Sequence, residues 1–158
     1  MDPDGGNGHD LAGPSGYDAR PFPCNASVTR FDAVPDRSTP RPDPRPAVVV
    51  DHRPWGNFRR YTCDEPSTVK LITVDAGQPL SLQRHTHRDE LWIVLDPGLL
   101  VQIGDATYET VAGDEFFIPR GTVHRVTGGA VAGRFVEICF GTFDEDDIER
   151  LADEFGRA

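Results

Sequence analysis

The sequence predicts an all-β domain built as a sandwich or a barrel of antiparallel strands. From residue 47 onward, short stretches rich in Val, Ile, Thr and Phe recur at near-regular intervals, with turn-forming residues between them. Strands of this length and spacing are typical of antiparallel sandwiches and barrels. The segments at the two ends of the chain have different patterns.

The first 46 residues have the composition of a segment that does not pack. They hold nine of the 14 prolines and five of the 16 glycines, with few aliphatic side chains. Such a segment buries too little apolar surface to offset the entropy of ordering. We therefore expect a disordered arm rich in Pro and Gly over residues 1–46 and one folded domain over residues 47–158, long enough for its own core.

The predicted strands of this domain follow one another with turns between them. Asp96-Pro97-Gly98 and Gly128-Gly129 are examples of these turns. The strands are AVVV (47–50), NFRRYT (57–62), TVKLITV (68–74), LWIVL (91–95), LLVQI (99–103), ATYETV (106–111), EFFIP (115–119), TVHRV (122–126) and RFVEICF (134–140).

The C-terminal segment changes period. Ile148, Leu151 and Phe155 recur at helical spacing, and acidic residues crowd the first turn, where the helix dipole favours them. Gly156 is suited to end a helix. The segment therefore predicts one short α-helix at the C-terminus.

Charge and hydropathy exclude several classes of partner. The formal net charge is −10, whereas a nucleic-acid surface needs a basic stripe. No run of about 18 apolar residues and no basic amphipathic stretch indicates a membrane partner. The chain also shows no basic start followed by an apolar run, which an export signal would need. We expect a cytoplasmic protein that binds neither nucleic acid nor membrane.

The stretch SLQRHTHRDELW at residues 81–92 concentrates side chains that bind metals. Alternate residues of a strand lie on one face, about 6.6 Å apart. His85 and His87 are therefore one candidate pair, with Glu90 as a third ligand. Gln83 and His85 are a second candidate pair, which leaves four residues as a connection before Glu90. The spacing alone allows both interpretations.

A second cluster favours the Gln83 interpretation. In residues 113–124 the spacing Gly-x5-Pro-x-Gly-x2-His matches the second motif of the cupin superfamily. Counted from Gly77, the first cupin motif has the form Gly-x5-ligand-x-ligand-x4-Glu. The resemblance to cupins implies a jelly-roll barrel, a homodimer, and a metal site whose ligands are Gln83, His85, Glu90 and His124.

This set of donors selects the kind of metal. Two neutral imidazoles, one carboxylate and one amide oxygen form a borderline-to-hard site of net charge −1. Zn²⁺ is the expected ion, with Mn²⁺ and Fe²⁺ as alternatives. A catalytic site would keep one further position open for water or substrate.

Four segments of the sequence go beyond the general cupin pattern. They are Arg53-Pro54-Trp55-Gly56, Gln83-x-His85-x-His87-Arg88-x-Glu90, Ile118-Pro119-x-Gly121-Thr122-x-His124-Arg125 and Asp146-Asp147-Ile148-x-Arg150. With these segments the sequence resembles one family of cupins, the type II phosphomannose isomerases. This resemblance implies metal-dependent interconversion of mannose 6-phosphate and fructose 6-phosphate, which serves mannose, GDP-mannose and polysaccharide metabolism.

Two residues depart from the family pattern. Leu91 stands where relatives usually have histidine, and Gly128 replaces the usual asparagine of the second motif. Strand alternation turns Glu90 into the barrel and Leu91 away from it. We therefore expect the change at Leu91 to act on packing more than on catalysis.

An aldose–ketose isomerisation needs a base near C1 and C2 and a group that binds phosphate. His87, Glu90 and Lys70 are the candidate bases, and Lys70 is the one lysine among 16 basic residues. Arg88 and Arg157 are the candidate phosphate ligands, because a guanidinium fork suits an oxyanion. Less specific candidates are Arg120 and Arg125.

Two other functions fit a metal-binding cupin. A catalytically silent cupin would bind a sugar phosphate without turnover, and the leucine at position 91 favours it. An Fe(II) oxygenase is the other alternative. Replacement of one imidazole by an amide weakens electron donation to iron, so the donor set favours non-redox chemistry.

Overall fold

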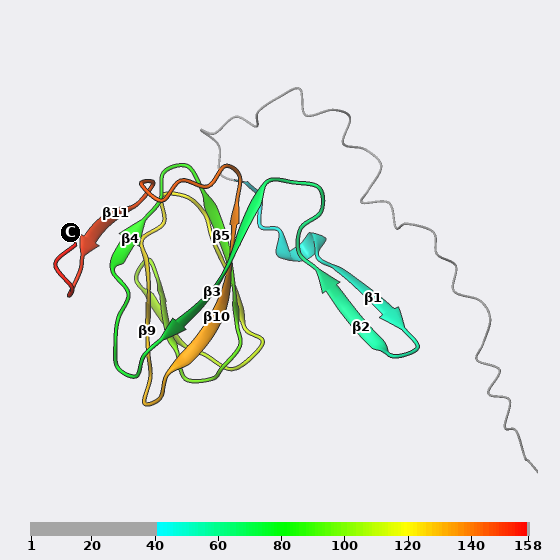
Figure 1. Ribbon diagram of the computed structural model, residues 1–158, viewed down its shortest axis with the longest axis horizontal. Helices are drawn as coiled ribbons and strands as arrows, with labels where there is room; N and C mark the ends of the chain where they lie inside the picture. The colour runs from blue at the N-terminus through cyan, green and yellow to red at the C-terminus, as the bar shows by residue number, and fades with distance from the viewer. Residues whose placement is uncertain (1–40, 158) are drawn as a thin grey trace, which may run out of the picture.

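The computed structural model describes residues 41–157, and these residues are almost entirely β-structure (Figure 1). The prediction of an all-β domain is confirmed. A short 3₁₀ turn, η1 (Arg45–Ala47), precedes the strands. The strands are β1 (Val49–Arg53), β2 (Gly56–Arg60), β3 (Ser67–Val74), β4 (Leu82–Arg84), β5 (Asp89–Val94), β6 (Leu100–Ile103), β7 (Ala106–Glu109), β8 (Glu115–Ile118), β9 (His124–Thr127), β10 (Gly133–Phe140) and β11 (Glu149–Ala152).

Nine of the strands form two antiparallel sheets. The four-stranded sheet has the order β3-β10-β5-β8, and the five-stranded sheet has the order β11-β4-β9-β6-β7. The remaining two, β1 and β2, pair with each other as a hairpin that projects from the barrel in Figure 1. From β3 to β11 the chain crosses from one sheet to the other at each step except between β6 and β7, which pair with each other, as in a jelly roll.

The main core lies between the two sheets. Val74, Trp92, Val94, Ile118 and Phe135 come from the four-stranded sheet and are at most 3% exposed. Apolar side chains of the five-stranded sheet complete the cluster, among them Val101 and Val126. Because side chains alternate along a strand, the polar residues two positions from these core residues also face the interior.

Leu91 lies on the opposite face of the four-stranded sheet from the main core. It is fully buried and belongs to a second cluster with Ile138 and Phe140. Its neighbour Glu90 is also fully buried but contacts the imidazoles in the interior. The structure confirms the expected alternation, so the residue at position 91 packs a surface away from the candidate ligands.

Two motif glycines take conformations that few other residues adopt. Gly77 has φ +68° in a turn closed by the Gln78 amide and the Asp75 carbonyl, 3.0 Å apart. Gly121 has φ +80° in a turn closed by the amide of Thr122 and the carbonyl of Pro119 at 3.1 Å. Both positions suit the third residue of a type II turn, which favours glycine.

Gly128 also has a structural reason. A Cβ atom at this position would lie 2.0 Å from the carbonyl oxygen of Asp75. The amide of Gly128 hydrogen-bonds the carbonyl of Gln78 at 2.9 Å. Two loops therefore approach each other closely at position 128. This approach excludes any residue larger than glycine and accounts for the absence of the asparagine expected there.

The predicted C-terminal helix is wrong: Glu149–Ala152 forms β11 instead. This strand pairs antiparallel with β4, where Glu149 lies opposite Arg84 and Arg150 lies opposite Gln83. Arg84 and Glu149 also form an ion pair of 2.7 Å. An isolated helix of this length is marginal in water, and the exposed edge of β4 offers unpaired backbone groups that a strand satisfies.

Of the predicted arm, residues 1–40 lie outside the described residues. The segment that follows contacts the barrel, because the amide of Arg41 donates to Asp89 at 3.3 Å. The Arg41 guanidinium also lies 3.8 Å above the ring of Phe140. Arg45 donates to the carbonyl of Glu115 at 2.9 Å. Within residues 41–157 no helix is long and apolar enough to cross a membrane.

Candidate metal centre

Both sheets contribute to a cluster of metal-binding side chains inside the barrel. Glu90 comes from β5, His124 from β9, and His85 follows β4 directly. The donor atoms of these three residues all lie within 4.8 Å of one another, and each residue is at most 2% exposed. Gln83 lies opposite His124 in the pairing of β4 with β9. The structure thus brings the four predicted ligands together.

The distances between these atoms suit a common ligand. Nε2 of His85 lies 3.2 Å from Oε1 of Glu90, and Nε2 of His124 lies 3.7 Å from Oε2 of Glu90. Nε2 of Gln83 lies 3.4 Å from Nε2 of His124. Donors about 2.0 to 2.2 Å from one ion are separated by roughly these distances. The four side chains therefore fit a divalent cation.

Hydrogen bonds fix the tautomers of both imidazoles. Nδ1 of His85 donates to the carbonyl of Asp147 at 2.6 Å, and Nδ1 of His124 donates to the carbonyl of Thr122 at 2.9 Å. Nδ1 of each ring therefore carries a proton, and Nε2 is the nitrogen that faces the cluster. Metal-binding histidines generally have this arrangement.

Gln83 can present its amide oxygen to the same point. Its Oε1 accepts from the hydroxyl of Ser81 at 2.8 Å, while its Nε2 faces His124. A hydroxyl both donates and accepts, so Ser81 keeps its bond when the amide turns over. The turned amide directs Oε1 toward the imidazoles and completes the donor set.

Arg88 brings a positive charge into the cluster. Its Nε donates to Oε1 of Glu90 at 2.8 Å, and one terminal nitrogen lies 3.1 Å from Nε2 of His85. The other terminal nitrogen donates to the carbonyl of Asp144 at 2.9 Å. The guanidinium thus balances the charge of Glu90. It also contacts Oε1 of Glu90 and Nε2 of His85, two atoms that are candidate metal donors.

Glu137 and Cys139 belong to the site and were not predicted from the sequence. Both are on β10, and their donor atoms lie within 4.8 Å of those of Glu90. Burial, and then the charge of Glu90, raise the pKa of Glu137. Burial, followed by the neighbouring carboxylates, raises the pKa of Cys139, so its thiol stays protonated. The sequence signal is the alternation in FVEIC, which puts a carboxyl group among inward-facing residues.

Lys70 lies beside this second group. It pairs with Glu137 across β3 and β10, and its Nζ is 3.6 Å from Oε1 of Glu137. Nζ also lies 3.5 Å from Glu145 and 4.1 Å from the ring centroid of Phe143. The lysine predicted from composition alone therefore reaches the barrel interior.

His87 does not join the cluster. Its side chain is exposed and lines a surface cavity of about 380 Å³ with four acidic residues. Its backbone amide donates to Asp147 at 3.0 Å, and the Thr86 amide donates to the same carboxylate at 2.9 Å. This cavity is strongly acidic and disfavours a phosphate ester.

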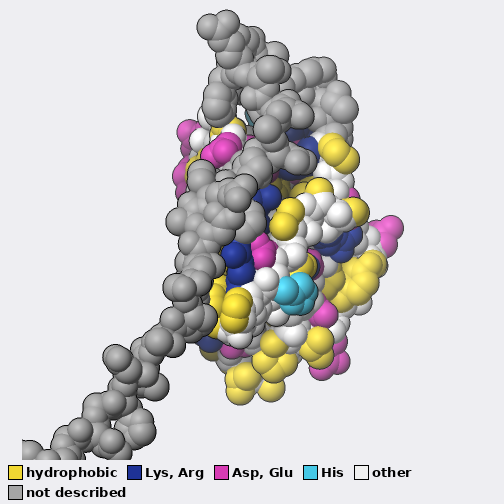
Figure 2. All heavy atoms as spheres, turned by 90° about the vertical axis from the view of Figure 1, so that its right-hand side faces the viewer, with side chains coloured by type: hydrophobic (Ala, Val, Ile, Leu, Met, Phe, Trp, Pro, Cys, Tyr) yellow, Lys and Arg dark blue, Asp and Glu magenta, His cyan; other side chains and the backbone are white. Residues whose placement is uncertain are grey.

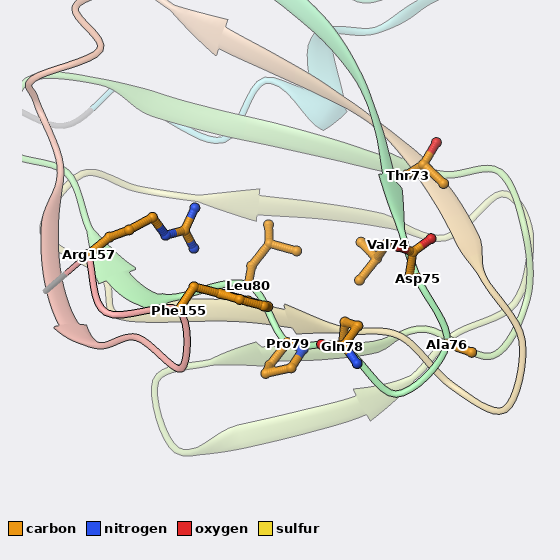
Figure 3. Close-up of a pocket in the computed structure, with 9 residues that line it drawn as sticks. All are labelled: Thr73, Val74, Asp75, Ala76, Gln78, Pro79, Leu80, Phe155 and Arg157. Atoms are coloured by element: carbon orange, nitrogen blue, oxygen red, sulfur yellow. The ribbon is translucent and has the colours of Figure 1, made fainter.

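Arg157 lies at a second cavity, of about 520 Å³ (Figure 3). Arg157 and Phe155 extend over Leu80, while the end of β3 lines the other side of the cavity. The guanidinium is about half exposed and forms an ion pair of 2.6 Å with Asp153. No residue of the donor cluster lines either of these two cavities. The connection from β10 to β11 contacts His85 through the carbonyl of Asp147 and Arg88 through the carbonyl of Asp144.

The two other arginines considered from the sequence have acidic partners. Arg120 forms a buried ion pair with Asp89. Arg125 lies 3.8 Å from Glu154 and donates to the carbonyl of Ala152 at 3.5 Å. Neither arginine contacts the donor cluster through a described hydrogen bond.

The titration of His85 predicts a pH dependence of stability. Burial, and then the charge of Arg88, lower its pKa from 6.5 to about 4. Between these values the unfolded chain binds a proton that the folded chain does not, so the free energy of unfolding falls as the pH drops from 6.5 to 4. The loss is about 3 kcal/mol for the chelated protein. Urea unfolding across this range measures it.

His85→Gln is the control for this pH dependence. The variant lacks the titrating ring, so its stability should depend less on pH between 4 and 6.5. Equal pH dependence in both proteins would contradict the assignment to His85.

Two facing antiparallel sheets with a buried His-Glu-His cluster between them define a cupin. The family described as Mannose-6-phosphate isomerase C-terminal matches residues 47–153, and the chain belongs to this family. The resemblance predicted from the motifs is thereby confirmed.

Similar proteins include an alginate biosynthesis protein and a mannose-1-phosphate guanylyltransferase. The alginate biosynthesis protein AlgA of Pseudomonas aeruginosa is 39% identical over 108 residues, which are 67% of this chain and 22% of AlgA. Mannose-1-phosphate guanylyltransferase 2 of Escherichia coli O157:H7 is 36% identical over 65% of this chain and 22% of its own length. The chain thus spans less than a quarter of these relatives.

Solved structures share the fold at low identity. The capsular polysaccharide assembling protein CapF of Staphylococcus aureus matches with a TM-score of 0.51 and 14% identity, over 67% of this chain and 34% of CapF. The epimerase RmlC of Legionella pneumophila matches with a TM-score of 0.51 and 12% identity, over 68% of this chain and 71% of RmlC.

Proposed function

We propose that the protein is a metal-dependent sugar-phosphate isomerase that interconverts mannose 6-phosphate and fructose 6-phosphate. The observation that carries the proposal is the convergence of Gln83, His85, Glu90 and His124 in a chain of the mannose-6-phosphate isomerase C-terminal family. A role in mannose and polysaccharide metabolism is consistent with the names of its relatives.

The donor set supports Zn²⁺ as the ion, with Mn²⁺ and Fe²⁺ as alternatives. Two imidazole nitrogens, a carboxylate and an amide oxygen suit these borderline ions. A bound cation would act as a Lewis acid and stabilise negative charge on a substrate oxygen. The chain itself holds the imidazoles in the required tautomer and excludes water from the buried donors.

The predicted catalytic and binding residues contribute to different degrees. Glu90 lies among the candidate donors and Lys70 contacts the buried Glu137, whereas His87 lines the acidic surface cavity and makes no described contact with the donors. For phosphate, the half-exposed Arg157 at its cavity is better placed than Arg88. The guanidinium nitrogens of Arg88 are already bonded to Glu90, His85 and Asp144.

A silent sugar-phosphate-binding cupin is the second candidate function. Two observations favour it: Arg88 contacts two of the candidate donor atoms, and His85, Glu90 and His124 are each at most 2% exposed. Such a protein would bind mannose 6-phosphate and return it unchanged.

A coupled assay separates the two functions. Metal-loaded protein should produce fructose 6-phosphate from mannose 6-phosphate, and chelation should abolish the product, because the developing charge on the substrate oxygen then lacks its cation. The assay detects fructose 6-phosphate enzymatically, with the chelated protein as control. Binding of mannose 6-phosphate without chelator-sensitive turnover would identify the silent cupin.

We also propose that the protein forms a homodimer. The β1–β2 hairpin exposes apolar side chains on a face that Figure 2 shows with several hydrophobic groups. The edge strand β3 exposes Val69 and Leu71, which are 60% and 61% accessible. Apolar surface on a projecting hairpin and an open sheet edge suits contact with a second copy. Light scattering measures the mass of the particle in solution, which should be that of two chains and not of one. The exposed hairpin residues are Val49, Val50, Trp55 and Phe58.

A further inference from the structure

One buried carboxyl group has no role in the donor set. Glu137 is 4% exposed and lies on β10, opposite Lys70 of β3 on one side and Trp92 of β5 on the other. Its Oε1 accepts from the thiol of Cys139 at 3.3 Å and lies 3.6 Å from the ammonium of Lys70. A carboxyl group buried this deeply is costly, so its position beside the donors calls for a function.

The other candidate bases are occupied or remote. Oε1 of Glu90 accepts from Arg88 at 2.8 Å, and its Oε2 accepts from the indole of Trp92 at 3.1 Å. The ammonium of Lys70 lies 3.6 Å from Glu137 and 3.5 Å from Glu145, and an ammonium has no lone pair to accept a proton. His87 is exposed at the acidic cavity.

Glu137 has the position that a base requires. A carboxylate oxygen of Glu137 lies within 4.8 Å of a Glu90 oxygen, and Glu90 in turn lies within 4.8 Å of His85 and His124. A sugar that places its C1 and C2 oxygens at the donor cluster would therefore bring the C1–C2 bond near Glu137. The ammonium of Lys70 and the thiol of Cys139 hold the carboxylate in place.

We propose that Glu137 is the catalytic acid–base of the isomerisation, an inference that rests on the proposed function. Its carboxylate takes the proton from C2 of the aldose, the C–H electron pair forms the C1=C2 bond, and the carbonyl π pair moves onto O1. The hydroxyl proton of O2 then passes to O1, C2 becomes the carbonyl, and the carboxylic acid of Glu137 returns its proton to C1. Atoms and electrons balance without a further reactant.

The test compares Glu137→Gln with Glu145→Gln. Both changes replace a carboxylate near Lys70 by an amide, but Glu145 is 77% exposed and lies outside the donor cluster. In Glu137→Gln the kcat should fall by about 10²- to 10⁴-fold, the range expected for a lost acid–base group. Deuterium at C2 of mannose 6-phosphate should no longer exchange with water. Zn²⁺ content after dialysis and calorimetric binding of mannose 6-phosphate should match the parent, and Glu145→Gln should keep the parent kcat.

Each other result refutes the role of Glu137. A Glu137→Gln variant that keeps more than about a tenth of the parent kcat shows that the proton has another acceptor. Loss of Zn²⁺ or of sugar-phosphate binding together with turnover shows that Glu137 is structural. If the amide prevents folding, Glu137→Asp replaces it: this variant keeps a displaced carboxylate, and a parental kcat in it would refute the role. A parent protein without turnover refutes the isomerase proposal itself, whereas an active parent with an active variant refutes the role of Glu137 alone.

Discussion

The His124→Ala variant should lose its bound divalent cation, whereas His87→Ala should retain it. Nε2 of His124 faces Glu90 and Gln83 inside the barrel, while the side chain of His87 is exposed to solvent. Even a group that only hydrogen-bonds a metal ligand contributes about 10- to 100-fold to affinity, so loss of a direct ligand should cost more than about 100-fold. Metal analysis after dialysis, and titration of Zn²⁺ against a competing chelator, measure the difference.

Circular dichroism supplies the control for this pair, because both variants must retain the parent spectrum. Equal loss of metal in the two variants would show that the His-x-His pair is the true ligand set. Equal retention would show that the cluster of His85, Glu90 and His124 does not bind the metal.

The Asp89→Ala variant should be destabilised by about 3 to 5 kcal/mol, the cost of breaking a buried ion pair from one side. Asp89 is fully buried, and its carboxylate accepts from the backbone amide of Arg120 at 2.8 Å and from Nε of Arg120 at 3.1 Å. It also accepts from the backbone amide of Arg41 at 3.3 Å. Its removal leaves the guanidinium of Arg120, which is 14% exposed, without this carboxylate. Urea unfolding followed by tryptophan fluorescence measures the change.

The double variant Asp89→Ala with Arg120→Met is the matched control. It removes both charges, so its free energy of unfolding should lie closer to the parent than that of Asp89→Ala. Simple addition of the two single effects would mean that Asp89 and Arg120 do not stabilise the fold as a pair.

Much of the fold was predictable because most strands have a recognisable local sequence pattern, a short apolar stretch between turn-forming residues. Each of the nine predicted strands coincides with a strand of the structure, although their bounds differ by a few residues. The spacing and the turn glycines also singled out the four candidate ligands, which the structure brings together, because this spacing depends on local geometry. The position of Leu91 followed from strand alternation alone.

The failures come from contacts between distant segments. The spacing of Ile148, Leu151 and Phe155 suits a helix, but the open edge of β4, more than sixty residues earlier, pairs with this segment as a strand. Glu137 was missed from the sequence for the same reason, because its proximity to Glu90 depends on the register of β10 against β5. Local pattern gives the face of a strand, but it does not give the neighbours across the sheet.

The pairing of β11 with β4 links the end of the chain to ion affinity. Arg150 lies opposite Gln83, and the carbonyl of Asp147 fixes the ring of His85, so an ordered segment 147–152 preorganises two of the four proposed donors. Coupling of this kind is reciprocal. An ion held by these donors would protect the last strand from fraying and proteolysis, and fraying of that strand would in turn release the ion.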